Sequence, residues 1–196
     1  MTSNTLIRNE ILAKRLEISL SQQTLAATAA TAHLVKHPLF LSSESIACYL
    51  PVRNELNTHE LIEHTWQSGK KCYLPVIEKS CPGQMNFALY CRNDLLIPNE
   101  FGILEPIDTA PRILAQALDL VITPLVAYDL QGNRLGSGCG YYDRVFAGIE
   151  KWPKAPKLCG FAYHQQQVST LYPESWDVPL DAVVTEESLV VLSFVA

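Results

Sequence analysis

The stretch DLVITPLVAYDLQGNRLGSGCGYYDRVFAGI (residues 119–149) contains four successive patterns. Residues 120–127 form a short apolar run that suits a buried strand, and residues 128–133 carry the Asp, Gly and Asn of a tight turn. Residues 134–140 alternate glycine with other residues, and residues 141–147 are typical of a helix that opens directly from that loop. The succession of strand, turn, loop and helix indicates an α/β fold with a ligand-binding loop.

Glycine at positions 136, 138 and 140 removes three side chains from one loop. The backbone can then approach a ligand closely and adopt positive φ. A helix that begins at such a loop directs free N–H groups into the same space, and Arg134 adds a forked cation at the entrance. We therefore predict a phosphate-binding loop. It is neither the dinucleotide fingerprint nor the P-loop, because no Gly-Lys-Ser/Thr sequence is present.

Asp143 is the unusual residue of this stretch. A carboxylate in the first turn of a helix interacts favourably with the helix dipole, but it would repel a phosphate bound beside it. A divalent cation between the two groups removes the conflict, since Mg²⁺ commonly binds one or two carboxylates together with substrate phosphates. The alternative is that Asp143 is only a helix N-terminal acid above a glycine turn.

The composition bounds the class of protein. At 196 residues the chain predicts a single domain spanning 1–196, and its hydrophobic content of 48% suits a globular protein. A net charge of −5 argues against a general nucleic-acid binder. We find no apolar run long enough to cross a membrane and no secretory signal, and the six cysteines contain no Cys-x-x-Cys pair. These features predict free thiols, and hence a cytoplasmic protein.

Apolar patterns predict that helices and strands alternate along the chain. Helices are expected at residues 4–35, with a new helix starting near Ser19 and Ser21 as its cap, and at residues 59–69, with a helical turn at 114–118. Strands are expected at 45–50, 71–77, a more exposed 85–90, 120–127, 157–163 and 181–185, whereas 101–106 reads as a loop and 189–195 as an apolar tail.

These elements predict an α/β fold: a single domain with a largely parallel central sheet flanked by helices, in a Rossmann-like three-layer sandwich. Ligands bind such sheets beyond the carboxyl ends of the strands. We therefore expect one cleft there, lined by the loop at 50–55, by Glu105-Pro106 and by the glycine loop. Arg8, Lys14 and Arg15 are expected on a mostly solvated helix face.

Several motifs recur in one order and at fitting intervals along nearly the whole chain. The longest is RLGSGCGYYDR (residues 134–144); shorter ones are ELNT (55–58), LPV (74–76), Met85-x-Phe87, GILEP (102–106) and WDVPLD (176–181). In these motifs the chain resembles the 5-formyltetrahydrofolate cyclo-ligase family, also called methenyltetrahydrofolate synthetase. The resemblance implies the ATP- and Mg²⁺-dependent cyclisation of 5-formyltetrahydrofolate to 5,10-methenyltetrahydrofolate, with release of ADP and phosphate, in folate one-carbon metabolism.

The resemblance also implies roles for individual residues. Arg134 and Tyr142 would be catalytic, Asp143 and Asp177 would hold Mg²⁺, and Met85 and Phe87 would offer flat apolar contact. Implied ATP contacts are Arg8, Arg134, Leu135, Gly136, Ser137, Gly138, Cys139, Gly140, Tyr141 and Tyr142. Implied folate contacts are Leu50, Glu55, Ser137, Gly138, Cys139, Gly140 and Tyr141. The expected partner is the small-molecule folate, with or without a polyglutamate tail. The protein is expected to be a monomer that binds neither nucleic acid nor membranes.

Plainer roles stay open for several of these residues. Glu55 would be an acid ahead of a helix, Asp177 a loop acid before proline, and the two tyrosines and Met85-x-Phe87 packing residues. Many family members carry Lys or Arg where this chain has Asn4, so one nucleotide contact would be lost or supplied by Lys14 or Arg15. Cys139 places a thiol in positively charged surroundings, which favour its reactive form, and its modification should impair ATP binding.

Three other functions remain compatible with the residues alone. The first is a related α/β enzyme, such as a sugar-phosphate isomerase or a CoA transferase, which would need an anion loop but no metal pair. The second is a folate-binding protein without catalysis, against which the presence of Arg134 and Asp143 argues. The third is a nucleotide-binding module with a different acceptor.

Overall fold

The computed structural model describes residues 3–78, 81 and 83–192. Its helices are α1 (Ser3–Leu16), α2 (Leu20–Val35), α3 (Pro38–Leu41), α4 (His59–Gln67) and α5 (Tyr141–Val145), with 3-10 turns η1 (Ala115–Ala117), η2 (Ile149–Lys151) and η3 (His164–Gln166). Its strands are β1 (Ser45–Ala47), β2 (Lys71–Ile77), β3 (Met85–Leu89), β4 (Leu96–Pro98), β5 (Leu104–Pro106), β6 (Arg112–Ile113), β7 (Leu120–Thr123), β8 (Ala127–Tyr128), β9 (Arg134–Leu135), β10 (Lys157–Phe161), β11 (Ala182–Val184) and β12 (Leu189–Val191). No helix of these residues is long and apolar enough to cross a membrane.

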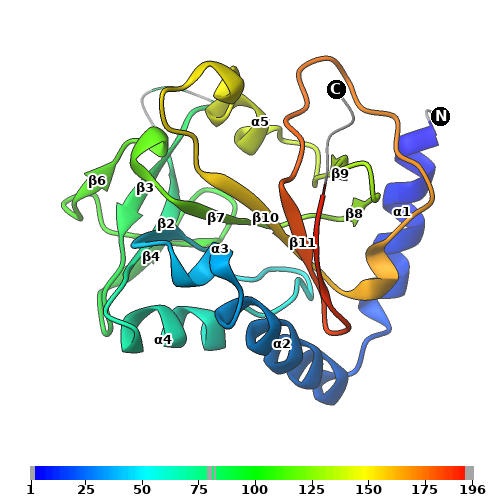
Figure 1. Cartoon of the computed structure of the whole chain (residues 1–196), viewed down its shortest axis with the longest axis horizontal. Helices are drawn as coiled ribbons and strands as arrows, with labels where there is room; N and C mark the ends of the chain where they lie inside the picture. The colour runs from blue at the N-terminus through cyan, green and yellow to red at the C-terminus, as the bar shows by residue number, and fades with distance from the viewer. Residues whose placement is uncertain (1–2, 79–80, 82, 193–196) are drawn as a thin grey trace.

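Eight of the described strands form one mixed sheet in the order β12-β11-β10-β7-β1-β2-β3-β6. The five strands from β11 to β2 are parallel, whereas β12, β3 and β6 pair in antiparallel fashion at the two edges. Helices α2, α3 and α4 cover one face and α5 lies on the other, while α1 packs beside β8 (Figure 1). The predicted α/β fold with a largely parallel sheet flanked by helices is confirmed.

Alternating side chains of the central strands fill two separate apolar layers. Leu120 and Ile122 of β7 pack with α2 and α4, whereas Val121 packs on the opposite face with Phe146. All three are fully buried, because a parallel strand in the middle of a sheet is covered on both faces. This explains why residues 120–127 read as a continuous apolar run rather than as an alternating one.

The apolar run at 120–127 does not form a single strand. β7 ends at Thr123, and β8 begins at Ala127 in a separate two-stranded hairpin with β9. Pro124 explains the break, because proline lacks the N–H that the next rung of the ladder requires. The predicted turn at 128–133 is confirmed: Asp129 Oδ1 accepts hydrogen bonds from the N–H groups of Gln131 and Asn133, each at 3.0 Å.

Other boundaries differ from the sequence-based expectation for local reasons. Ser19, not Ser21, caps α2: its Oγ accepts the Gln22 N–H and the Gln22 side chain accepts the Ser19 N–H, which is a capping box. The strands at 45–50, 157–163 and 181–185 are shorter than predicted, and α4 ends at Gln67, two residues before Gly69 with its φ of +71°. Strand β2 has the predicted bounds, 71–77.

Two predictions for the segments that follow β2 are wrong. Strand β3 is not exposed, since Phe87 and Ala88 are fully buried between β2 and β6. The segment expected as a loop at 101–106 contains β5, which pairs with β4 as a hairpin. Within the expected tail at 189–195, residues 189–191 form β12 antiparallel to β11, and residues 193–196 lie outside the described residues.

Candidate active site

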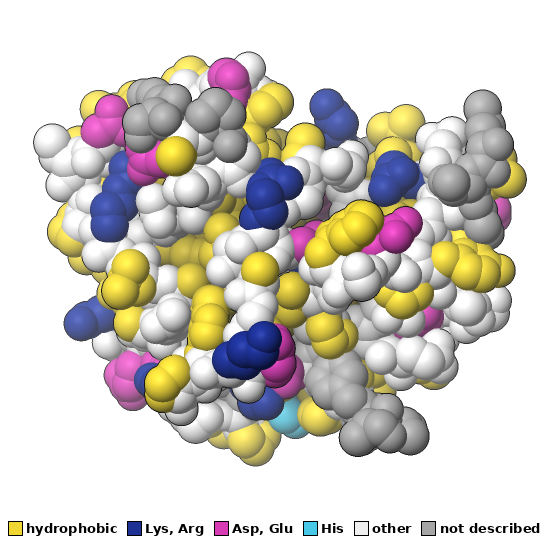
Figure 2. Space-filling view, turned by 90° about the horizontal axis from the view of Figure 1, so that it is seen from above, with side chains coloured by type: hydrophobic (Ala, Val, Ile, Leu, Met, Phe, Trp, Pro, Cys, Tyr) yellow, Lys and Arg dark blue, Asp and Glu magenta, His cyan; other side chains and the backbone are white. Residues whose placement is uncertain are grey.

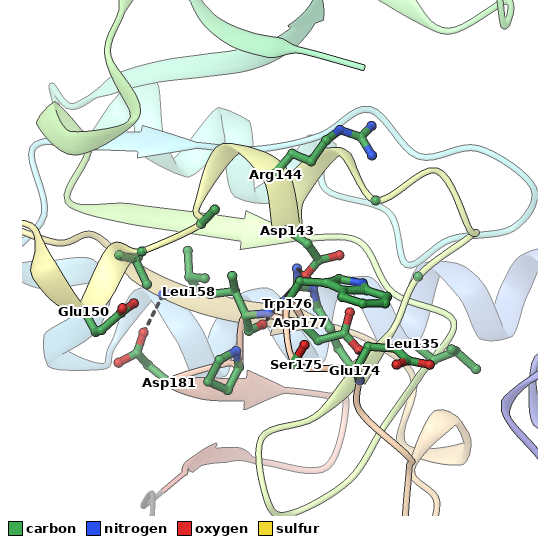
Figure 3. Close-up of a pocket in the computed structure, with 18 of the residues that line it drawn as sticks. Leu135, Asp143, Arg144, Glu150, Leu158, Glu174, Ser175, Trp176, Asp177 and Asp181 are labelled. Atoms are coloured by element: carbon green, nitrogen blue, oxygen red, sulfur yellow. Dashed lines mark hydrogen bonds and ion pairs between the residues drawn. The ribbon is translucent and has the colours of Figure 1, made fainter. Parts of the chain in front are cut away.

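A cavity of about 1190 Å³ opens between the start of α1, the glycine loop, α5 with η2, and residues 172–181. Figure 2 views this side of the molecule, where basic and acidic side chains border a hollow. The cavity unites segments that are far apart in the sequence, as the close-up in Figure 3 shows. The predicted site residues that line it are Arg8, Arg134, Leu135, Gly136, Gly138, Gly140, Asp143 and Asp177.

Arg134 joins the glycine loop to the segment that precedes β11. Its side chain is only 5% exposed, and its Nη2 donates to Asp143 Oδ1 at 2.5 Å. Nη1 of the same guanidinium donates to the backbone carbonyl of Val178, whose N–H donates in turn to Asp143 Oδ1 at 3.2 Å. The guanidinium is therefore held in one orientation at the cavity wall, as a forked cation that recognises phosphate should be.

Arg8 reaches the same loop from α1. Its Nε donates to the carbonyl oxygen of Gly136 at 3.0 Å, so the first helix and the glycine loop are connected through a cation that faces the cavity. Arg8 and Arg134 thus place two positive charges beside backbone that carries no side chains at Gly136 and Gly138. This arrangement suits a polyanionic ligand.

Asn4 also lines the cavity, but it is engaged in holding the chain together. Its Nδ2 donates to the carbonyl of Tyr172 at 2.7 Å, and its Oδ1 accepts the Tyr172 N–H at 3.2 Å. The expected substitutes do not reach this place. Lys14 pairs with Glu10 at 2.7 Å outside the cavity, and Arg15 is buried elsewhere. Neither Lys14 nor Arg15 therefore lines the cavity beside Asn4.

Asp143 and Asp177 converge on this cavity from different segments (Figure 3). Asp177 uses Oδ2 to accept the Glu174 N–H at 2.9 Å, and Asp143 uses Oδ1 for its two donors. Among the described residues, each carboxylate therefore has its other oxygen available for a cation. No group of three or more His, Cys, Asp or Glu side chains gathers among the described residues. Two carboxylates are a donor set that suits Mg²⁺ where phosphate oxygens and water complete its coordination.

The glycine loop adopts the backbone that its composition predicts at two of three positions. Gly138 and Gly140 have φ of +111° and +63°, and Gly140 is the N-cap of α5, whereas Gly136 has no positive φ. Helix α5 is shorter than the predicted 141–147. Ser137 and Cys139 are exposed between the glycines and do not line the cavity. Of this part of the loop, Gly136, Gly138 and Gly140 line it.

The other predicted contacts lie outside this cavity. Leu50 is half-buried against the core, and Glu55 is half-buried with Oε2 accepting the Val52 N–H at 3.0 Å. The Tyr141 ring lies under the Arg144 guanidinium at 5.0 Å. The Tyr142 ring stacks on Phe146 at 6.4 Å.

The Tyr142 hydroxyl points away from the solvent. It is buried and has no hydrogen-bond partner among the described residues. Burial is the main cause that raises the pKa of Tyr142, and the negative charge of Glu55 raises it further. Tyr142 thus lies in the electrostatic field of Glu55, although no hydrogen bond joins the two side chains among the described residues.

The expectation of one cleft at the carboxyl ends of the strands is wrong. Lys157 and Asp181, which line the cavity, lie at the amino ends of β10 and β11, while Glu55 follows the carboxyl end of β1. The reason is the β8–β9 hairpin, which turns the chain back so that the glycine loop and α5 return across the sheet face.

Glu105, Met85 and Phe87 are structural residues. Glu105 is buried, and its Oε1 accepts the Ile77 N–H at 3.0 Å and the Asn99 side-chain amide at 2.7 Å, which ties the β4–β5 hairpin to β2. Met85 is 6% exposed and Phe87 is fully buried, with its ring 6.1 Å from that of Phe146. The core interpretation, not the flat ligand contact, describes Phe87.

Sequence reasoning missed part of the lining. Tyr172, Lys157 and Asp181 face the cavity, and Lys157 pairs with Asp181 at 2.7 Å. Trp176, which is 67% exposed, lines the same cavity as Asp143 and Asp177 (Figure 3). The motif at 176–181 marks two of these residues, but Tyr172 and Lys157 carry no sequence signal. All six cysteines are free, as expected.

Comparisons with known proteins agree with this picture. The sequence profile of the 5-formyltetrahydrofolate cyclo-ligase family matches residues 1–186. The 5-formyltetrahydrofolate cyclo-ligase of Escherichia coli strain K12 is 38% identical over 84% of this chain and 89% of its own length. That of Haemophilus influenzae is 36% identical over 89% of this chain and 92% of its own length.

A solved structure of a similarly named enzyme has the same fold as this chain. The NMR structure of Aquifex aeolicus 5,10-methenyltetrahydrofolate synthetase superposes with a TM-score of 0.82 at 28% identity, covering 100% of this chain and 94% of that one. The cavity that joins Arg134, Asp143 and Asp177 is thus built from the motifs on which the resemblance depends. With a profile match over nearly its full length, the chain belongs to the 5-formyltetrahydrofolate cyclo-ligase family.

Proposed function

We propose that this protein uses ATP to cyclise 5-formyltetrahydrofolate to 5,10-methenyltetrahydrofolate, releasing ADP and phosphate. The observation that carries the proposal is the ion pair of Arg134 with Asp143, placed in one cavity with Arg8 and Asp177. Cations and carboxylates in one cavity suit a nucleotide phosphate bound together with a divalent cation. Membership of the 5-formyltetrahydrofolate cyclo-ligase family identifies 5-formyltetrahydrofolate as the acceptor of the phosphoryl group.

The reaction needs activation because a formyl amide is a poor electrophile. The formyl oxygen attacks the γ-phosphorus of ATP, and the bond to the β–γ bridging oxygen breaks as ADP leaves. N10 then closes on the formyl carbon and loses its proton to solvent, and the phosphorylated oxygen departs as phosphate. The tasks left to the protein are to position two ligands and to neutralise phosphate charge.

On the nucleotide side, Arg134, Arg8 and the backbone of residues 135–142 would contact the phosphates. Asp143 and Asp177 would hold Mg²⁺, which when bound neutralises phosphate charge and fixes the phosphate chain. Arg134 is already oriented by Asp143 and the Val178 carbonyl, so it loses little freedom on binding.

On the folate side, Leu50 and Glu55 would contact the pterin, with the glycine loop between them and the nucleotide. A carboxylate such as Glu55 accepts two hydrogen bonds from the N–H donors of an aminopyrimidinone edge. Support comes from Tyr142: burial and then the charge of Glu55 raise the pKa of its phenol, and its helix starts at the glycine loop. The formyl group and the γ-phosphate would meet at this loop, next to Tyr142.

We propose further that the enzyme works as a cytoplasmic monomer on folates with or without a polyglutamate tail. Support for the compartment is chemical: six free cysteines, three of them exposed, are compatible with a reducing environment.

The test is direct. Purified protein is mixed with 5-formyltetrahydrofolate and ATP, and the absorbance of the methenyl product is followed. Formation of product that requires both ATP and Mg²⁺, and that is lost in folded Arg134→Ala and Asp143→Asn variants, is the expected result. Equal rates with and without Mg²⁺ would contradict the metal assignment, and folded protein that binds ATP without forming product would contradict the acceptor.

A further inference from the structure

Arg144 is a further arginine that lines the cavity, and it differs from Arg134 in how its guanidinium is used. Arg134 donates from both terminal nitrogens to protein groups, Nη1 to the Val178 carbonyl and Nη2 to Asp143. Arg144 donates from Nε to the Gly83 carbonyl at 2.6 Å, and its Nη1 and Nη2 have no hydrogen-bond partner among the described residues. No ion pair joins Arg144 to a carboxylate in the same part of the chain, so its terminal N–H groups are available to a ligand.

The guanidinium of Arg144 is seated against two glycines and one aromatic ring. A Cβ on Gly83 would lie 3.3 Å from Nε, and one on Gly140 would lie 3.1 Å from Nη1, so a side chain at either position would crowd the guanidinium. The guanidinium carbon lies 5.0 Å from the centroid of the Tyr141 ring. The ring contact and the hydrogen bond to Gly83 therefore orient this exposed side chain before any ligand binds.

The two ends of the glycine loop are contacted by different arginines. Arg8 donates from Nε to the carbonyl of Gly136, the first glycine, at 3.0 Å, whereas Arg144 reaches Gly140, the last one. Figure 3 shows the side chains of Arg144 and Asp143 leaving α5 in different directions, although both residues line the cavity. A phosphate chain that lies along the loop would therefore meet one cation at each end.

The position of the folate decides which phosphate lies near Arg144. In the proposed reaction, the formyl group meets the γ-phosphate next to Tyr142, which follows Gly140 by two residues. The γ-phosphate would then lie at the Arg144 end of the loop, and the other phosphates toward Arg8. Charge spreads over the γ-phosphoryl oxygens in the transition state of such a transfer, and a forked cation with free N–H groups stabilises that charge.

We propose that Arg144 binds the γ-phosphate of ATP through Nη1 and Nη2, at the end of the glycine loop opposite Arg8. This inference rests on the proposed use of ATP, and it adds which cation binds the phosphate that is transferred. It also gives the Gly83 carbonyl a role, because that carbonyl holds Nε and leaves the two terminal nitrogens for the ligand.

Equilibrium titration with MgATP and MgADP, without folate, tests the inference because ADP lacks the γ-phosphate. In Arg144→Met, Kd for ATP should rise by about tenfold or more, since a bound phosphate loses a charged hydrogen-bond partner. Kd for ADP should stay close to the wild-type value. Arg144→Lys keeps the charge without the fork and should recover part of the ATP affinity. Equal weakening of ATP and ADP would overturn the assignment, because a general disturbance of the loop affects both nucleotides.

The matched control is Arg92→Met. Arg92 is exposed, and its guanidinium lies 5.7 Å from the Trp66 ring, so it resembles Arg144 in its aromatic contact but lies outside the cavity. This variant should bind both nucleotides as the wild type does.

Arg144→Gln covers the case in which Arg144→Met does not fold. Its side-chain amide nitrogen takes the position of Nε and keeps a donor for the Gly83 carbonyl, but it carries no charge. The expected loss of ATP affinity is the same as for Arg144→Met. A folded neutral variant of Arg144 with the wild-type Kd for ATP would overturn the inference.

The wild-type titrations separate this inference from the proposed function. If the wild type binds neither MgATP nor MgADP, the proposed function fails and the inference fails with it. If the wild type and Arg92→Met bind both nucleotides while the neutral Arg144 variants keep their ATP affinity, only the inference about Arg144 fails. Loss of ATP affinity with unchanged ADP affinity in the neutral Arg144 variants supports both.

Discussion

Arg134 shows how much a single side chain can fix in this site. One end of its guanidinium binds the Val178 carbonyl and the other binds Asp143 at 2.5 Å, and only 5% of the side chain is exposed. A lysine at this position carries the charge but has a single ammonium group, which does not span both partners in a fixed plane. A substitution of Arg134 by lysine therefore separates the effect of the positive charge from that of the two-pronged guanidinium geometry.

We expect Arg134→Lys to lower kcat/KM for ATP by about a hundredfold, because a phosphate loses a bidentate partner and Asp143 loses its fixed neighbour. Initial rates at varied MgATP concentration measure the effect. Arg92→Lys is the matched control, since Arg92 is an exposed arginine paired with Glu63 and lies outside the cavity. Equal kcat/KM in Arg134→Lys and wild type would show that only the charge matters.

Cys139 offers a second test at the level of one residue. The thiol is exposed between Gly138 and Gly140, both of which line the cavity. Alkylation adds bulk at the entrance of the phosphate loop, so N-ethylmaleimide should weaken ATP binding by about tenfold or more. Equilibrium binding of ATP before and after treatment measures this.

The control for Cys139 lies in the same chain. In Cys139→Ser the exposed Cys81 and Cys91 still react, so full ATP affinity after treatment of this variant assigns the effect to Cys139. If the alkylated wild type and Cys139→Ser both keep full ATP affinity, the thiol has no influence on the nucleotide site.

At the level of elements, local chemistry was predictable and long-range packing was not. Strand 71–77, the turn at Asp129 and the positive φ of Gly140 follow from residue type alone. Pro124 also indicated that the strand ends at Thr123, but the apolar residues that continue to Ala127 favoured a longer strand. The burial of Arg15 was not readable, because it depends on strands more than a hundred residues away.

Gly140 and Gly136 separate backbone strain from ligand contact. Gly140 has a φ of +63°, and a Cβ there would lie 3.1 Å from Arg144 Nη1, whereas Gly136 has neither a positive φ nor a neighbour within 4 Å. Gly140→Ala should therefore reduce the free energy of unfolding by about 1–2 kcal/mol. Gly136→Ala should leave it nearly unchanged. Chemical denaturation without ligand measures both, and equal loss in the two variants would contradict the assigned strain.

At the level of the whole molecule, the site depends on three segments that only the fold brings together. Residues from the segments 4–8, 134–144 and 172–181 line one cavity, and the sequence indicated some of them in each segment by residue type. It did not place the cavity, because the β8–β9 hairpin redirects the chain away from the carboxyl edge where open parallel sheets usually bind ligands. Tyr172 and Lys157 were missed for the same reason.

Because the ligand would bridge these three segments, MgATP should stabilise the entire fold rather than one loop. At about a hundred times Kd, the linkage relation gives ~2.7 kcal/mol, or a rise in Tm of roughly 5 to 10 °C for a domain of this size. Asp177→Asn should lose the Mg²⁺-dependent part of that rise, since its carboxylate lines the cavity, whereas Asp108→Asn, outside it, should keep the full rise. Thermal denaturation with ATP, with and without EDTA, makes the measurement. A rise in Tm that EDTA leaves intact in the wild type would remove Mg²⁺ from the site, and would leave the arginines that line the cavity to neutralise the phosphates alone.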